Sequence, residues 1–136
     1  MKKYIAIIMV FAFIFLCIGC TASEDYPGIS FTQVESVHVW VQGTYNEIQL
    51  NADDMETFVA LYNQSQYMGE GTGNGGTPEW GVFVCYKNGD ELYINEFNGF
   101  EDFEVSLHTS TGKKAWCYIN NQELMGFLTE IVEGMG

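Results

Sequence analysis

Apolar and polar residues alternate along several short segments of this chain, and that period of two constrains the fold most. Val37, Val39 and Val41 alternate with polar or aromatic neighbours, and Ile48 and Leu50 continue the pattern after Gly43-Thr44. Such alternation predicts strands with one buried face. Further strands are predicted over 80–87, 91–96, 103–107 and 115–119, with Asn88-Gly89 and Ser110-Thr111-Gly112 as hairpin turns.

Two segments carry the helical period instead. Met55, Phe58, Val59 and Tyr62 make residues 52–64 amphipathic. A last helix follows Asn120 or Asn121 as its cap and ends at Gly134, with the stripe Leu124, Phe127, Leu128 and Ile131. The sequence therefore predicts an α+β domain: one antiparallel sheet of about six strands with two helices packed on one face, in the order ββα-ββββ-α.

The N-terminus has the layout of an export signal. Lys2 and Lys3 precede an apolar stretch, Tyr4 to Ile18, without charge or proline. This stretch is shorter than the roughly 20 apolar residues of a stable membrane span. An uncut N-terminal membrane helix remains the alternative interpretation.

The end of this stretch, Leu16-Cys17-Ile18-Gly19-Cys20, resembles the lipobox of bacterial lipoproteins. The resemblance implies cleavage before Cys20, a diacylglyceryl lipid on its sulfur, and a place on the extracytoplasmic side of the bacterial cell membrane. The chain departs from the family in having Cys17 where a leucine is usual. We expect a signal peptide over 1–19, a lipidated N-terminus and tether over 20–33, and a single domain over 34–136.

The charge balance excludes whole classes of partner. After cleavage only three lysines oppose 18 acidic residues, a net charge of −15, and the chain has no arginine. Such a surface repels phosphate backbones and anionic headgroups, so we expect no nucleic-acid binding and attachment to the membrane through the lipid alone. The acidity either serves solubility or indicates a basic partner or a divalent cation.

A glycine-rich tract, GEGTGNGG, contains the spacing G-x-G-x-x-G at Gly71, Gly73 and Gly76. A phosphate-binding tract of this kind leaves a strand and enters a helix. Here a predicted helix precedes the glycines and a strand follows them, so we expect no nucleotide binding. The tract is interpreted as part of a long polar loop over 63–79.

The cysteines and histidines do not match the pattern of a catalytic or metal-binding site. Cys85 and Cys117 form either a disulfide, as in many exported proteins, or a pair of buried free thiols. Strand parity predicts that both point into the core while His38 and His108 point away, which excludes a Cys–His pair. Their spacing matches no metal site. We therefore expect no enzyme activity, cofactor or metal.

The same parity places an unusual set of rings on the face away from the helices. An exposed sheet face is normally polar, and aromatic clusters on it are typical of binding sites. The alternative interpretation is a second small core beneath the glycine loop or within the curved sheet. The predicted face comprises Trp40, Tyr86, Tyr93, Trp116 and Tyr118, with His38 and His108.

These observations favour a lipid-anchored envelope protein that binds a protein, peptide or glycan partner through this face and catalyses no reaction. An alternative function is inhibition of a secreted or envelope hydrolase through the acidic, aromatic segment Phe97 to Phe103.

Overall fold

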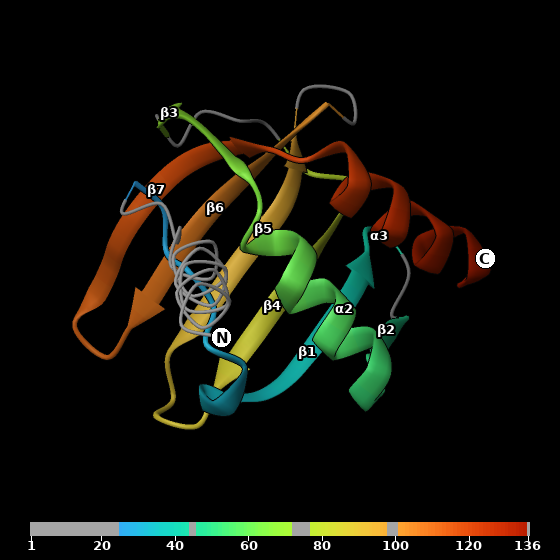
Figure 1. Cartoon of the computed structure of the whole chain (residues 1–136), viewed down its shortest axis with the longest axis horizontal. Helices are drawn as coiled ribbons and strands as arrows, with labels where there is room; N and C mark the ends of the chain where they lie inside the picture. Colours follow the sequence, from blue (N-terminus) through green and yellow to red (C-terminus); the bar gives the residue numbers. More distant parts are fainter. Residues whose placement is uncertain (1–24, 44–45, 72–76, 98–100, 136) are drawn as a thin grey trace, which may run out of the picture.

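The computed structural model describes residues 25–43, 46–71, 77–97 and 101–135, without the side chains of 114–116. It is an α+β structure, as predicted, with one antiparallel sheet in front of which both helices lie (Figure 1). The elements are η1 (Phe31–Gln33), β1 (Val34–Val41), β2 (Glu47–Gln49), α2 (Ala52–Tyr62), β3 (Gln66–Glu70), β4 (Trp80–Tyr86), β5 (Glu91–Phe97), β6 (Asp102–Thr109), β7 (Gly112–Asn120) and α3 (Gln122–Gly134).

The sheet has seven strands in the order β2-β1-β4-β5-β6-β7-β3. The strands from β4 to β7 form a meander, and β1 joins it by pairing with β4. One strand more than predicted is present, because Gln66–Glu70 pairs with β7 along the far edge (Figure 1). This segment was expected to be loop, and only the pairing with β7 reveals it as a strand.

The core lies between the sheet and the helices. Alternate strand residues such as Val37, Val82 and Ile94 are fully buried and meet Phe58 of α2 and Leu128 of α3. The stripes predicted from the helical period thus face the sheet. Burial of one large apolar side chain stabilises the fold by about 1.5–3 kcal/mol.

Both helices begin at an asparagine. The Asn51 side chain accepts a hydrogen bond from the backbone N–H of Asp54, and that of Asn121 accepts one from Leu124. Each such cap is worth about 1 kcal/mol. Asn121 also donates to the carbonyl of Leu61 at 2.7 Å, so it ties the start of α3 to the last turn of α2.

The turn between β4 and β5 is one residue longer than the two-residue turn predicted at Asn88-Gly89. The Tyr86 N–H donates to the Asp90 carbonyl and the Gly89 N–H donates to the Tyr86 carbonyl, both at 2.9 Å, with Gly89 at φ +91°. This is the pattern of a three-residue loop that closes with a glycine bulge. Tyr86, rather than Lys87, therefore faces Asp90.

That single residue reverses the faces of β4. Val82 and Val84 now oppose Ile94 and Leu92 in the core. The prediction that Cys85 points inward is wrong: it shares the outward side with Phe83 and opposes Glu91. The prediction that Tyr86 points outward is wrong for the same reason, because Tyr86 packs against the core.

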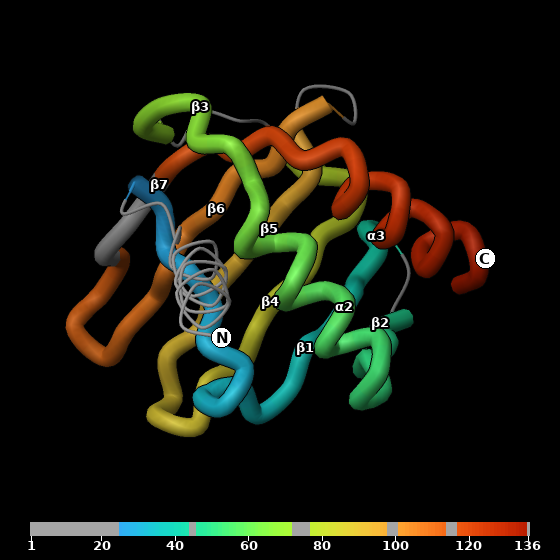
Figure 2. The backbone as a smooth tube through the Cα atoms, viewed as in Figure 1, coloured from blue at the N-terminus to red at the C-terminus, as the bar shows by residue number. Residues whose placement is uncertain are grey.

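The segment before β1 belongs partly to the domain. Tyr26 and Ile29 are only 5% exposed, and Tyr26 Oη donates to the Asn63 carbonyl at 3.0 Å. Asn63 brackets Ile29, since its amide accepts from the Ile29 N–H and donates to the Ile29 carbonyl. The blue segment in Figure 2 accordingly lies beside the end of α2. The predicted tether is thus wrong for residues 26–33, while the signal peptide and Cys20 lie outside the described residues.

Candidate functional site

The face of the sheet opposite α2 and α3, here called the helix-free face, carries most of the rings that the sequence placed there. Trp40, His38, Tyr93, His108 and Tyr118 lie on it, each between buried and fully exposed. Tyr86 lies on the core side instead, and the side chain of Trp116 is outside the described part of the chain. Sequence reasoning missed Phe83, because of the turn length, and Phe97, which continues the alternation of β5.

Four rings form a continuous line across the sheet, here called the ring row. His38 of β1 stacks on Phe83 of β4 with ring centroids 4.7 Å apart, and Phe83 lies 6.1 Å from Tyr93 of β5. Tyr93 in turn meets the edge of His108 of β6 at 4.8 Å. Such ring pairs add about 0.5–1.5 kcal/mol each beyond the area they bury.

The two polar rings at one end of the row have shifted pKa values. Tyr93 Oη donates to Glu91 Oε2 at 2.6 Å, and this hydrogen bond, with burial, raises the pKa of Tyr93 to about 12. Burial lowers the pKa of His108, and the nearby Lys113 lowers it further. Both shifts favour the uncharged form of the side chain.

A second set of residues, here called the acceptor row, crosses the same face one step along the strands. Its members face one another in register, from Trp40 through Gly81, Asn95 and Glu104 to Tyr118. Phe97 stacks on Tyr118 with ring centroids 4.7 Å apart. The polar side chains of Asn95 and Glu104 therefore lie between aromatic side chains at the two ends of the row, and Gly81 next to Asn95 contributes no side chain.

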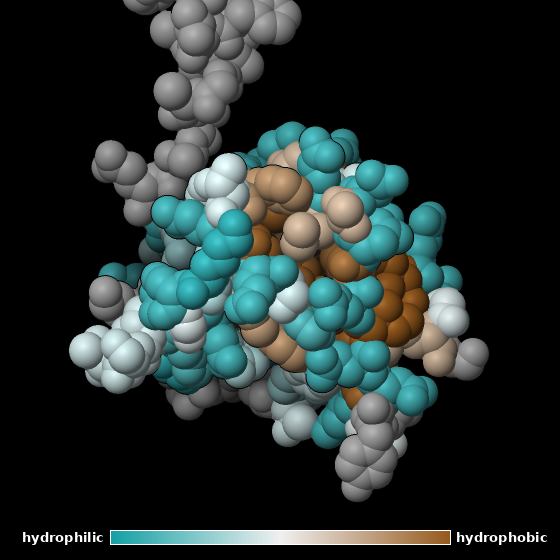
Figure 3. All heavy atoms as spheres, turned by 90° about the horizontal axis from the view of Figure 1, so that it is seen from below, coloured by the Kyte–Doolittle hydropathy of each residue, from teal (hydrophilic) through white to brown (hydrophobic). Residues whose placement is uncertain are grey.

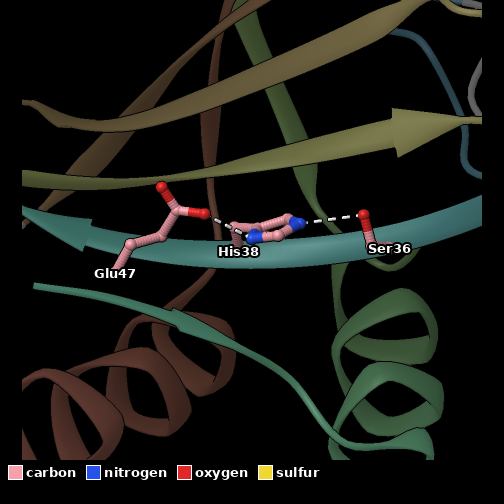
Figure 4. A network of polar contacts seen from close by, with 3 residues as sticks. All are labelled: Ser36, His38 and Glu47. Atoms are coloured by element: carbon pink, nitrogen blue, oxygen red, sulfur yellow. Dashed lines mark hydrogen bonds and ion pairs between the residues drawn. The ribbon is translucent and has the colours of Figure 1, made fainter.

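A polar network lies at the other end of the ring row. His38 Nδ1 contacts Glu47 Oε1 at 2.5 Å, and its Nε2 lies 2.8 Å from Ser36 Oγ (Figure 4). A carboxylate at Nδ1 favours the tautomer in which Nε2 accepts the serine proton, an arrangement shared with serine hydrolases. Ser106 and His108 repeat the serine–histidine contact at 3.0 Å, because residues two apart on a strand share a face.

The two thiols lie on opposite sides of the sheet. Cys117 is buried in the core, and burial raises its pKa to about 11, whereas Cys85 is half-buried on the helix-free face. Three strand spacings separate β4 from β7, about 14 Å. A disulfide between Cys85 and Cys117 therefore does not form, and both cysteines are free.

Apolar surface is also found outside this face. Phe31, Ile48 and Met68 are each more than a third exposed and belong to three separate elements. Seen from below, apolar surface gathers in the middle and on the side of β2 and α3, framed by hydrophilic side chains (Figure 3). A pocket of about 340 Å³ lies near η1 and the turn after β4, lined in part by Thr32, Tyr86 and Lys87.

Comparison with protein-family models, with curated proteins and with solved structures found no match. In the part of the chain that the structure describes, no helix is long and apolar enough for a membrane span. The same residues contain no group of three or more histidine, cysteine or acidic side chains placed to hold a metal ion. The geometry of the helix-free face is thus the basis for a functional proposal.

Proposed function

We propose that this chain is an envelope protein, anchored through a lipid on Cys20, that binds a partner through the helix-free face and catalyses no reaction. The observation that carries the proposal is the line of touching rings across β1, β4, β5 and β6 on the face that α2 and α3 leave open. The export signal and lipobox support the location.

The interaction is tested by recovery of partners from envelope extract. Trp40→Ala with Tyr118→Ala should lose the partner, because the two rings flank the acceptor row. Phe31→Ala is the matched control, since it removes an exposed ring from η1, away from this face. Circular dichroism verifies that each variant is folded. Equal recovery by the wild-type chain and the folded double variant would refute the proposal.

The anchor is tested separately. Metabolic labelling with a fatty acid should mark the wild-type chain and leave Cys20→Ala unmarked and released from the membrane. Labelling of both chains would contradict lipidation at Cys20. Recovery of a hydrolase as sole partner, with its activity reduced by the purified chain, would instead support the inhibitor function.

One observation favours a second candidate function, ester hydrolysis at Ser36. The network of Ser36, His38 and Glu47 supplies a nucleophile, a base and an orienting carboxylate. However, β1 pairs with both β2 and β4 around His38, so the neighbouring backbone N–H groups are committed to the sheet and an oxyanion needs other donors. A fluorophosphonate that labels the wild-type chain and not Ser36→Ala would support this function over the non-catalytic one.

A further inference from the structure

Two oxygen atoms in the acceptor row are buried and have no hydrogen-bond donor. They are Asn95 Oδ1 and Glu104 Oε2. The two residues face each other across β5 and β6, where side chains on the same face are close neighbours. Buried acceptors are almost always satisfied, and a carboxylate oxygen is among the costliest to leave without a partner.

The surroundings of these atoms are shaped by Gly81. A side chain at this position would place its Cβ 2.4 Å from Asn95 Oδ1 and 2.9 Å from Trp40 Nε1. The amide oxygen and the indole edge therefore converge over the glycine, and Trp40 closes one end of the row. Tyr118, opposite Glu104, and Phe97 stacked on it close the other end.

The charge around the row is negative. Glu47 faces Trp40 and Asp102 faces Phe97, so both lie next to the row, whereas Glu91 and Lys113 both face His108 and lie farther along the strands. Lys87 lies at the turn after β4, where its Nζ donates to the Thr32 carbonyl at 2.9 Å. With a net charge of −13 for the whole chain, the field favours the approach of a cation.

We propose that the acceptor row binds an ammonium group, as carried by a lysine side chain or a free alkylamine. This rests on the proposed function and narrows its ligand to a chemical class. An ammonium has three donors and no acceptor, so it satisfies Asn95 Oδ1 and Glu104 Oε2 together and neutralises the carboxylate. The rings of Trp40 and Tyr118 attract the same charge and cover the attached carbon chain.

The ligand reaches the row by a movement of a side chain. Both acceptor atoms are closed to solvent, and the Trp40 ring lies over Gly81 beside one of them. Rotation of Trp40 away from Gly81 opens the amide oxygen, and the ring then closes on the bound alkyl chain. Binding therefore changes the surroundings of the Trp40 indole.

Calorimetric titration of the full chain in a nonionic detergent tests the proposal. The probes are Nα-acetyl-lysine methylamide and cadaverine, with the Nε-acetylated lysine derivative as the neutral control. We expect saturable binding of at least one amine at about 20 mM salt, weaker binding at higher salt, and at least about tenfold weaker binding of the neutral control. Binding of both amines indicates recognition of the ammonium alone, and binding of the lysine derivative alone indicates a peptide ligand.

Glu104→Gln should weaken amine binding by about tenfold or more, since it removes the charge and keeps the shape. The ligand-free variant should melt at the same or a higher temperature, because it replaces a carboxylate group whose Oε2 is buried without a hydrogen-bond donor. Glu56→Gln, on an exposed position of α2, makes the same change in net charge and should leave binding unchanged. Asn95→Ala removes the other acceptor and serves if Glu104→Gln does not fold.

The outcomes separate this inference from the proposed function. Absence of amine binding, equal binding by Glu104→Gln, or tighter binding of the neutral derivative overturns the ammonium site. If Glu104→Gln retains the envelope partner while the Trp40 and Tyr118 double variant loses it, only the ammonium site fails. If both variants retain the partner, the binding face itself fails.

Discussion

Replacement of Gly81 by alanine tests the arrangement of the acceptor row through stability. Gly81 is buried in β4, and its backbone is not in the left-handed region, so an added methyl group is tolerated by the backbone. Such a replacement normally stabilises a protein by about 0.4–1 kcal/mol, because it restricts the unfolded chain. The structure predicts the opposite sign, because the new Cβ lies 2.4 Å from Asn95 Oδ1 and 2.9 Å from the Trp40 ring.

The size of the loss follows from what has to move. Overpacking of this kind costs about 1–3 kcal/mol, and the lower half of that range applies because both obstacles are side chains that can rotate. The cost of about 1–2 kcal/mol, less the gain of about 0.4–1 kcal/mol, leaves an expected net loss of about 1 kcal/mol, which lowers Tm by about 4 °C in a domain of this size. Thermal unfolding followed by circular dichroism measures this directly.

Gly126→Ala is the matched control. Gly126 lies on an exposed position of α3 with nothing within 4 Å of the added Cβ, so alanine should stabilise the chain by about 0.5–1 kcal/mol. A Gly81→Ala chain that is as stable as the wild type, or more stable, would refute the placement of the Trp40 ring over Gly81.

Three further predictions concern titratable groups. A maleimide near pH 8, followed by peptide mapping, should label Cys85 in the folded chain and Cys117 only after denaturation. Cys117 is buried, and the rise of its pKa from 9.0 to about 11 cuts its thiolate fraction about 100-fold. Equal labelling rates for the two cysteines would contradict their placement on opposite faces of the sheet. Burial raises the pKa of Tyr86 from 10.0 to about 12, so its contribution to stability is present below pH 10 and is lost as pH rises toward about 12. In Tyr86→Phe the free energy of unfolding should therefore fall less steeply with pH between pH 10 and 12. A fall as steep as in the wild type would show that Tyr86 is not buried. Burial lowers the pKa of His108 below 6.5, so its contribution to stability is present above pH 6.5 and is lost as pH falls through the lowered pKa. His108→Gln should therefore lose less stability on acidification than the wild type. An equal loss in both chains would show that His108 does not cause it.

The period of the apolar residues was enough to predict the class of fold. It predicted the strands because residues such as Val37 recur every second position, which puts them all on one face only in a strand. It predicted the two helices because residues such as Phe58 and Leu124 recur every three or four positions, which puts them all on one face only in a helix. A helix cap at Asn120 or Asn121 and a turn at Asn88-Gly89 were also predicted, since each depends on local chemistry, and the structure has the cap at Asn121 and a turn that is one residue longer. These features are encoded within a few residues of the chain.

Features that depend on distant pairing were not predictable. Gln66–Glu70 is polar and becomes a strand only against β7. Tyr26 is buried, and its hydroxyl donates a hydrogen bond to the backbone carbonyl of Asn63, which lies 37 residues further along the chain. One local feature was also mispredicted: the turn at Gly89 is one residue longer than expected, which places Cys85 outward and Tyr86 inward.

The candidate site shows the same division. Trp40 and Tyr93 were placed correctly because alternation within one strand decides their face. Asn95 and Glu104 were not singled out, because their meaning lies in the register between β5 and β6 and in the absence of a donor for Asn95 Oδ1 and Glu104 Oε2. The sequence of a strand does not show whether a polar side chain in it has a hydrogen-bond partner in the folded structure.

The central claim is that ligand recognition takes place on the helix-free face, and the indole N–H signals of a ¹⁵N-labelled chain test it most directly. During titration with Nα-acetyl-lysine methylamide, the signal of Trp40, assigned by a Trp40→Phe variant, should move and saturate. The signal of Trp80, which is only 3% exposed in the core, should stay in place. A shift at Trp80 with none at Trp40 would move recognition away from this face, and the account would be wrong.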